Sequence, residues 1–128
     1  MSWKFDNNQP IYLQICNIIK LQIVTGQLKI GERLPSVRDL AEIAGVNPNT
    51  IQRALSDLEN QGFVYSKRTS GRFVTDNQEL ITVTRHTLAH QELQNFVTNM
   101  QNLGFKNDEI VPELEIFLGG NSNDSATR

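Results

Sequence analysis

The stretch that decides the fold is SVRDLAEIAGVNPNTIQRALSDL, residues 36–58, which predicts two short amphipathic helices joined by a tight turn. Ser36 is expected to cap the first helix, with Asp39 three residues further on, as in a capping box. Gly45 is expected to end this helix, because glycine adopts the left-handed conformation that stops a helix at little cost. The pattern predicts a helix-turn-helix.

The second helix of this pair carries polar side chains opposite its apolar stripe. Asn47 is expected to cap it, and Pro48 falls in its first turn, where a missing backbone N–H costs nothing. In a helix-turn-helix, the N-terminal end of the second helix meets base edges in the major groove. The alternative is an ordinary amphipathic pair whose polar residues face water. The polar residues at this end are Asn49, Thr50, Gln52 and Arg53.

A β-hairpin is predicted directly after the second helix. Residues 63–65 and 72–75 are rich in aromatic and β-branched residues, and the polar segment 66–71 between them is expected to form the loop. Lys67, Arg68 and Arg72 place positive charge on or beside its tip, which suits a phosphate backbone or a minor groove. A loop of solvated charges is the alternative. The position after a helix-turn-helix favours a wing.

Another helix is predicted before the helix-turn-helix, in PIYLQICNIIKLQIVTG, residues 10–26. Its apolar arc is broad, so most of its surface is expected to be covered. Cys16 lies on the apolar side and is interpreted as a small buried residue rather than a redox sensor. The predicted order is therefore three helices followed by a wing.

Several segments together resemble the N-terminal winged-helix domain of the GntR family of bacterial transcription regulators. In chain order they are PIYLQI, GERLPSVRDLA, GVNPNTIQRAL, LE and SGRFV, and they lie between residues 10 and 74. The wording VNPNTIQRA, together with the short remainder of the chain, resembles the YtrA subfamily in particular. The resemblance implies a winged-helix domain that binds double-stranded DNA.

The resemblance also implies which residues contact DNA. In the family the arginine after the LPS segment contacts DNA, which assigns this role to Arg38. The wing tip of the family usually reads GxGTFV and enters the minor groove, whereas here Thr69 replaces the first glycine and Arg72 replaces the threonine. The predicted DNA contacts are Ser36, Arg38, Asn47, Asn49, Thr50, Gln52, Arg53, Arg68, Thr69, Ser70, Gly71 and Arg72.

Charge is divided unevenly along the chain. The formal net charge is −2, but residues 1–78 carry nine Lys and Arg against seven Asp and Glu, which gives +2. Residues 79–128 carry three against seven, which gives −4. The acidic part is therefore expected to face away from DNA. The sequence shows neither a membrane-crossing apolar run nor a signal peptide, so a cytoplasmic location is expected.

Two further helices are expected after the wing. Residues 79–103 form the first, Gly104 ends it, and Asn107 is expected to cap the second, with Pro112 within its first turn or so. Two helices of this length are not expected to pack together and also enclose a ligand pocket of about 300 Å³. A second copy is therefore expected to cover their apolar faces, the alternative being that they pack onto the winged-helix domain. The predicted dimerisation residues are Leu93, Phe96, Val97, Met100, Leu103, Ile110, Leu114 and Phe117.

No catalytic or metal-binding pattern stands out. His86 and His90 are spaced to share one helix face, but the sequence offers no obvious third ligand. Neither a nucleophile with its base nor a phosphate-binding glycine loop is recognisable. No enzyme activity, cofactor or metal is therefore expected.

The expected fold class is mainly α with a small β wing. A winged helix-turn-helix domain is expected in residues 1–78, a short two-helix dimerisation region in residues 79–118, and a disordered tail in residues 119–128. The expected function is a sequence-specific transcriptional regulator, a repressor that binds a palindromic operator as a homodimer. The alternative is a winged-helix module for protein interaction or DNA architecture without operator specificity. Any small-molecule effector is expected at an interface.

Overall fold

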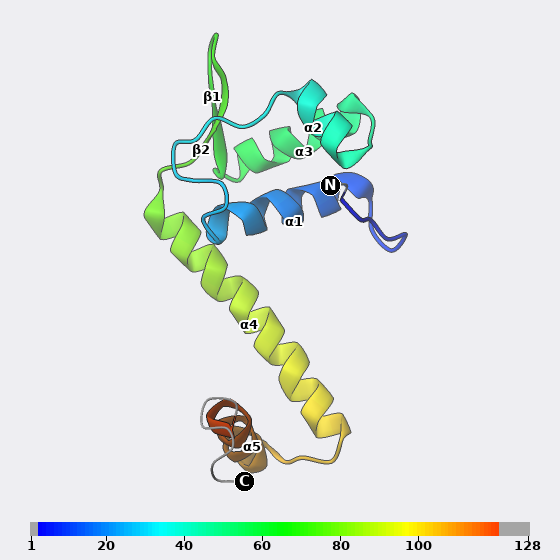
Figure 1. Ribbon diagram of the computed structural model, residues 1–128, viewed down its shortest axis with the longest axis vertical. Coiled ribbons are helices and arrows are strands. Elements are labelled where there is room, and N and C mark those ends of the chain that lie inside the picture. Colours follow the sequence, from blue (N-terminus) through cyan, green and yellow to red (C-terminus); the bar gives the residue numbers. More distant parts are fainter. Residues whose placement is uncertain (1–2, 121–128) are drawn as a thin grey trace. The chain divides into compact units, whose positions relative to one another are not determined.

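The structure is a computed structural model that describes residues 3–120, shown in Figure 1. It divides into two compact units, the first ending at Arg85 and the second beginning at His86. The elements in chain order are α1 (Ile11–Val24), α2 (Val37–Ala44), α3 (Pro48–Asn60), β1 (Val64–Lys67), β2 (Gly71–Val74), α4 (Gln78–Asn102) and α5 (Asn107–Gly119). The mainly α fold with a small β wing is therefore confirmed.

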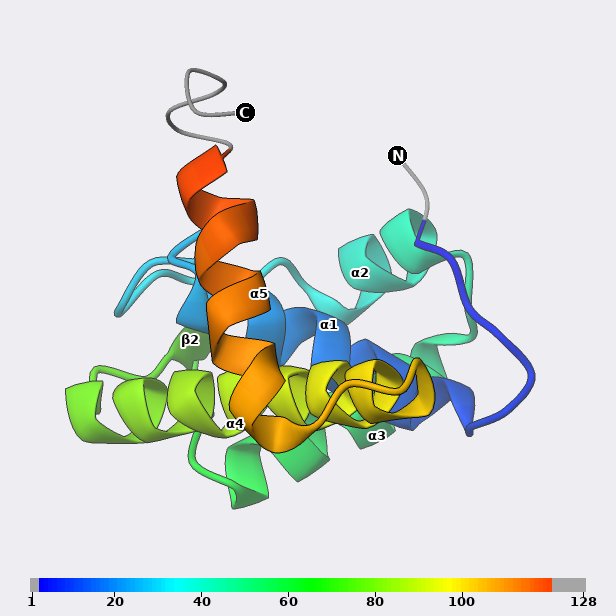
Figure 2. The same cartoon turned by 90° about the horizontal axis from the view of Figure 1, so that it is seen from below.

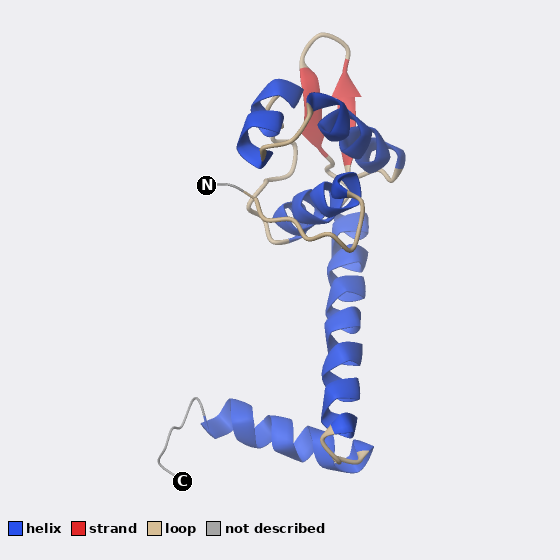
Figure 3. Ribbon diagram, turned by 90° about the vertical axis from the view of Figure 1, so that its right-hand side faces the viewer, coloured by secondary structure: helices blue, strands red, loops and turns tan. Residues whose placement is uncertain are grey.

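The core of the first unit forms where α1 and α2 pack against α3. The broad apolar arc of α1 is covered as predicted, with Ile15 and Ile19 no more than 1% exposed. Ile51, Leu55 and Leu58 on α3 are equally buried, because their spacing places them on one helix face. In Figures 1 and 3 the β-hairpin projects away from α1.

The helix-turn-helix forms through the predicted local signals. The Ser36 Oγ accepts a hydrogen bond from the backbone N–H of Asp39 at 3.0 Å, which caps α2. Gly45 follows α2 with φ 71°, in the left-handed region. The Asn47 Oδ1 accepts from the backbone N–H of Asn49 at 2.7 Å, and Pro48 begins α3. These caps fix where the two helices start and end.

The paired strands of the wing extend further toward its tip than predicted, so its loop is shorter. Strands β1 and β2 pair antiparallel from Val64 with Val74 as far as Lys67 with Gly71, so the loop is confined to residues 68–70. The strands extend because the φ of 104° at Gly71 allows a tight turn. Residues 31–34 also run along β2, where the Leu34 N–H donates to the Arg72 carbonyl at 2.9 Å. This third extended segment was not predicted from the sequence.

The helices after the wing correct two expectations. Lys106, not Asn107, precedes α5, and the Glu109 carboxylate accepts from the Lys106 backbone N–H at 2.8 Å. The Asn107 side chain instead accepts from the Gln101 Nε2 at 2.7 Å. Pro112, expected within the first turn or so, lies in the second turn of α5, because the helix begins at Asn107.

Helix α5 turns away sharply from the last turns of α4 after residues 103–106, as Figures 2 and 3 show. Helix α5 includes Gly119, which was expected to be the first residue of the disordered tail. Residues 121–128 of the predicted tail lie outside the described residues. Within the described part of the chain, none of the helices has the length and apolar character to cross a bilayer.

Candidate nucleic-acid interface

The N-terminal end of α3 presents the predicted polar side chains to solvent. Asn49, Gln52 and Arg53 are exposed, and Thr50 is half-buried. The N-terminus of a helix carries partial positive charge, which favours contact with phosphate. The cap residue Asn47 is also exposed, and its side chain already accepts from the backbone of Asn49. This end of α3 therefore combines hydrogen-bonding side chains with a favourable helix dipole.

The start of α2 adds a second exposed group of predicted contacts. Ser36 and Arg38 are both exposed, although the Ser36 hydroxyl oxygen is used to cap its own helix. The cap leaves the hydroxyl hydrogen available as a donor, since a serine hydroxyl both donates and accepts. The Arg38 guanidinium is suited to phosphate because it supplies several donors on a permanent positive charge.

Arg53 is held by an aromatic ring that the sequence analysis did not connect with it. Its guanidinium carbon lies 3.8 Å from the centre of the Tyr12 ring, a cation–π contact between α3 and α1. Tyr12 is half-buried and Arg53 is exposed. The contact fixes the direction of the Arg53 side chain before any ligand binds.

The tip of the wing is polar and exposed. Arg68, Thr69 and Ser70 form the loop between the strands and are all exposed, as is Gly71. The Lys67 Nζ lies 4.7 Å from the centre of the Phe73 ring, which directs this cation along the hairpin. The wing therefore presents cations from strand and loop together.

Arg33 is an additional cation at the wing that the sequence analysis missed. It is exposed and forms an isolated bridge with Phe73 on β2. Its side chain lies against Gly71, where an added Cβ would come within 3.2 Å of the Arg33 Nε. Its only sequence signal is the nearby LPS motif, since its contact with the wing depends on the pairing of residues 31–34 with β2.

Arg72 has a protein partner, although it was predicted as a DNA contact. Its Nε lies 3.2 Å from the Glu59 Oε1, and its side chain is 19% exposed. Partial burial raises the pKa of the Glu59 carboxyl, but hydrogen bonds from Ser66 and Arg72 outweigh this and lower it below its ordinary value. Contact between Arg72 and DNA remains a prediction.

The second unit leaves several predicted dimerisation residues uncovered. Leu93, Leu103 and Phe117 are 53%, 73% and 63% exposed. Ile110 is only 6% exposed, so in a single copy it does not belong to the exposed apolar face. The remaining predicted dimerisation residues are half-buried: Phe96, Val97, Met100 and Leu114.

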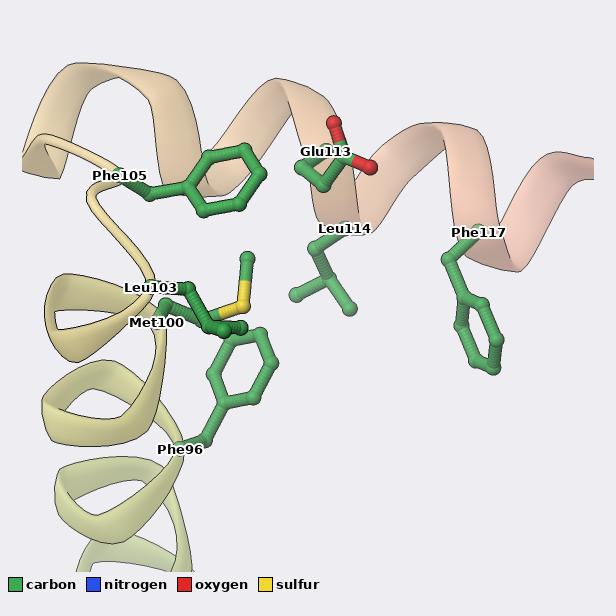
Figure 4. Close-up of a pocket in the computed structure, with 7 residues that line it drawn as sticks. All are labelled: Phe96, Met100, Leu103, Phe105, Glu113, Leu114 and Phe117. Carbon is green, nitrogen blue, oxygen red and sulfur yellow. The ribbon is translucent and has the colours of Figure 1, made fainter.

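An apolar hollow of about 360 Å³ lies between the end of α4 and α5, as Figure 4 shows. This hollow is open to solvent rather than enclosed, so the expectation that two packed helices do not also enclose a pocket of this size stays a prediction. Helix α5 turns away from the last turns of α4 after residues 103–106, so the two helices do not lie side by side along their length. The lining residues are Phe96, Met100, Leu103, Phe105, Glu113, Leu114 and Phe117.

Cys16 and the two histidines lie outside these surfaces. Cys16 is buried, its Sγ lies 3.4 Å from the Ala54 carbonyl oxygen, and burial raises its pKa to about 11. This confirms Cys16 as a small core residue. His86 and His90 are both exposed on α4, and in residues 3–120 no group of three His, Cys, Asp or Glu side chains is placed to hold a metal ion.

Comparison with known proteins identifies the protein family to which this fold belongs. Residues 11–74, which run from α1 to the end of the wing, match the family model of the bacterial regulatory proteins, gntR family. The chain belongs to the GntR family. It is therefore a DNA-binding transcriptional regulator with a winged-helix domain, as its capped α2–α3 pair and hairpin indicate.

Relatives in the GntR family share both units. YhcF, an uncharacterized HTH-type transcriptional regulator of Bacillus subtilis, is 37% identical and covers 94% of this chain and 99% of its own. The HTH-type transcriptional repressor YtrA of the same organism is 30% identical over 92% of this chain and 95% of its own. The predicted resemblance to YtrA-like regulators is thus supported beyond the winged-helix domain.

Solved structures agree with this placement in the GntR family. A GntR family transcriptional regulator from Listeria monocytogenes is 38% identical, with a TM-score of 0.77 over 87% of this chain and 97% of that chain. The DNA-binding domain of AraR in complex with operator ORX1 is 29% identical, with a TM-score of 0.54 over 59% of this chain and 95% of that chain.

Proposed function

We propose that this GntR-family regulator is a repressor that binds a palindromic operator as a homodimer. The observation that carries the proposal is the capped N-terminal end of α3, whose exposed polar residues lie in the same compact unit as a cationic wing. Similarity to a named repressor, YtrA, supports repression. Such a protein acts by occupying DNA that polymerase would otherwise use.

Major-groove readout is assigned to α3. Asn49, Thr50 and Gln52 offer both donors and acceptors, which base edges in the major groove require. Ser36 and Arg38 at the start of α2 are assigned to the phosphate backbone, together with the cap residue Asn47. The similarity to the operator-bound AraR domain supports binding of this domain to an operator.

The wing is assigned to the minor groove or the adjacent phosphates. Arg68 is its exposed tip cation, and Thr69, Ser70 and Gly71 complete the loop. Arg33 is added to this set because its side chain lies against Gly71. Contacts of this kind bind without reading the full base code, since the minor groove mainly distinguishes A·T from G·C pairs.

Association of two copies is assigned to the second unit. Leu93, Leu103 and Phe117 are more than half exposed, and such large apolar side chains gain free energy when a partner covers them. A two-fold dimer then presents two copies of α3 to two half-sites about 34 Å apart, which is one turn of DNA. The acidic character of this part keeps it away from DNA.

The proposed location and the lack of a proposed reaction follow from the role as a regulator. We assign the protein to the cytoplasm, where bacterial operators lie, and we propose no catalytic step for it.

A small-molecule effector would bind where the second unit meets its partner, because the hollow beside α5 is lined by residues that a second copy would cover. Binding there would change the spacing of the two α3 helices and hence operator affinity.

The test compares two substitutions on a duplex selected from a random library by binding to the protein. Arg38→Ala should weaken binding to all DNA and reduce the slope of log affinity against log salt by about one. Gln52→Ala should cost about 1–3 kcal/mol on the selected duplex and little on random DNA. Gln61→Ala, at the far end of α3, is the matched control.

Salt-titrated mobility shifts and a footprint provide the readout. A footprint with two symmetric half-sites supports the operator proposal. Unchanged binding by both Arg38→Ala and Gln52→Ala would refute the groove assignment. Binding without any preferred sequence would favour the architectural module.

A further inference from the structure

Glu59, on α3, connects this helix to both strands of the wing. It lies in the last turn of α3, and its Oε1 accepts from the Ser66 Oγ at 3.0 Å and from the Arg72 Nε at 3.2 Å. Ser66 is on β1 and Arg72 is on β2. One carboxylate oxygen therefore holds the two strands of the hairpin at once.

These contacts hold the hairpin beyond the part of it that is buried against the core. Ser66 and Arg72 are directly paired across the strands, two residues nearer the tip than the pair Val64 and Val74. Residues two apart on a strand share a face, so the face that packs on the core at the base continues as the polar contact to Glu59. Val64 and Val74 are at most 2% exposed, whereas the loop beyond is exposed. Glu59 is thus the outermost anchor that α3 offers the hairpin.

The contact is charge-assisted and partly shielded from water. The Arg72 side chain is 19% exposed and that of Glu59 is 35% exposed. The two hydrogen bonds favour the ionised form of Glu59 and so lower its pKa. Arg72 stands where the family wing motif has threonine, so this anchor uses a departure of this chain from that motif.

We infer that Glu59 is a positioning residue for DNA binding, which holds the wing in a fixed orientation to α3, and that Arg72 acts through Glu59. The inference rests on the proposed contact between the wing and DNA. Two elements that enter neighbouring grooves must be placed together, and a wing held before binding loses less conformational freedom on the DNA. The loop of residues 68–70, with Arg68, is the part of the wing whose position relative to the DNA depends on Glu59.

A competing arrangement makes the opposite prediction. If DNA phosphate drew Arg72 away from Glu59, the carboxylate would oppose binding by competing for the guanidinium and by repelling phosphate. Removal of Glu59 would then raise affinity. In the positioning role, its removal lowers affinity, so the sign of the effect separates the two arrangements.

The experiment is a double-substitution cycle in the full chain on the selected duplex. Glu59→Ala should weaken binding about two- to fivefold, and Arg68→Ala should weaken it by a similar factor. In the Glu59→Ala background, Arg68→Ala should have a smaller effect, because a loosely held wing has already lost part of that contact. Glu42→Ala, which removes an exposed carboxylate from α2, controls for net charge.

Further measurements separate positioning from loss of folding and from failure of the proposed function. The thermal midpoint of Glu59→Ala should stay close to that of the unchanged protein, while amide exchange in residues 64–74 of the free protein should accelerate. Unchanged or increased affinity on Glu59→Ala, or independent effects of Glu59 and Arg68, would overturn the inference alone. No effect of Arg68→Ala would overturn the wing contact and the inference with it, while Gln52→Ala still tests α3.

Discussion

The two units of this regulator differ in where their apolar side chains lie. Of the eighteen buried hydrophobic residues in the described part of the chain, seventeen belong to the first unit and only Ile110 to the second. Both units expose some large apolar side chains, but those of the second are more exposed: Leu103 and Phe117 exceed 60%, whereas none in the described part of the first unit exceeds 54%. A unit with its own core folds by itself, whereas a unit with exposed apolar faces gains stability by association.

The largest expected effect comes from separating the units. A fragment ending at Arg85 should fold and remain monomeric, because it keeps the core and the buried Ile81 at the start of α4. Its affinity for a two-half-site operator should fall about a hundredfold to ten-thousandfold, because the second half-site no longer meets a tethered partner. Light scattering and mobility shifts measure both. A stable dimer of the fragment would place the interface in the first unit.

A pair of large-to-small substitutions compares the two units directly. Leu55→Ala should lower the free energy of unfolding by about 2–5 kcal/mol, because Leu55 is 1% exposed and its loss leaves a cavity. Phe117→Ala, at a residue 63% exposed, should cost under about 0.5 kcal/mol when the protein is dilute enough to be monomeric. Urea denaturation followed by circular dichroism measures both losses. Equal losses would contradict the difference between the units.

Alkaline pH probes the interior of the first unit through Cys16. Its pKa is raised from 9.0 to about 11 in the folded chain, so the folded state keeps the thiol protonated where the unfolded state ionises. This stabilisation is complete below pH 9 and is lost as the pH rises toward 11, a total of about 2–3 kcal/mol. Cys16→Ala should remove that part of the pH dependence in denaturation curves. Identical curves, or rapid alkylation of Cys16 in the folded protein at pH 8, would show that the thiol is not shielded.

A charge on the exposed face of the second unit should have the smallest of these effects. Leu93→Asp should weaken self-association about tenfold or more, because a partner that covers residue 93 would bury an unpaired carboxylate. Asn95→Asp is the matched control, since residue 95 is exposed and lies away from the apolar stripe of α4. Sedimentation velocity across a concentration series measures the dimer. The same dimer affinity in both variants would show that the dimer interface does not include this face of α4.

Local patterns accounted for the parts of the fold that depend on neighbouring residues. The caps at Ser36 and Asn47 and the end of α2 at Gly45 lie where predicted, because each depends on a few adjacent backbone groups. The cap of α5 was misplaced by one residue. The two candidates are neighbours, and the Asn107 side chain accepts from Gln101, six residues earlier, instead of capping the helix.

The sequence by itself determined the helix-turn-helix, the wing and the family, because caps, helical spacing and strand alternation are local properties of the chain. Only the tertiary structure decided what the charged side chains contact. Glu59 meets Arg72 across 13 positions, and Arg53 meets Tyr12 through the packing of α3 on α1. Neither pair follows a helix or strand period, because each depends on how separate elements pack. The hollow beside α5 has the same origin, since the direction of α5 is set by the turn after α4.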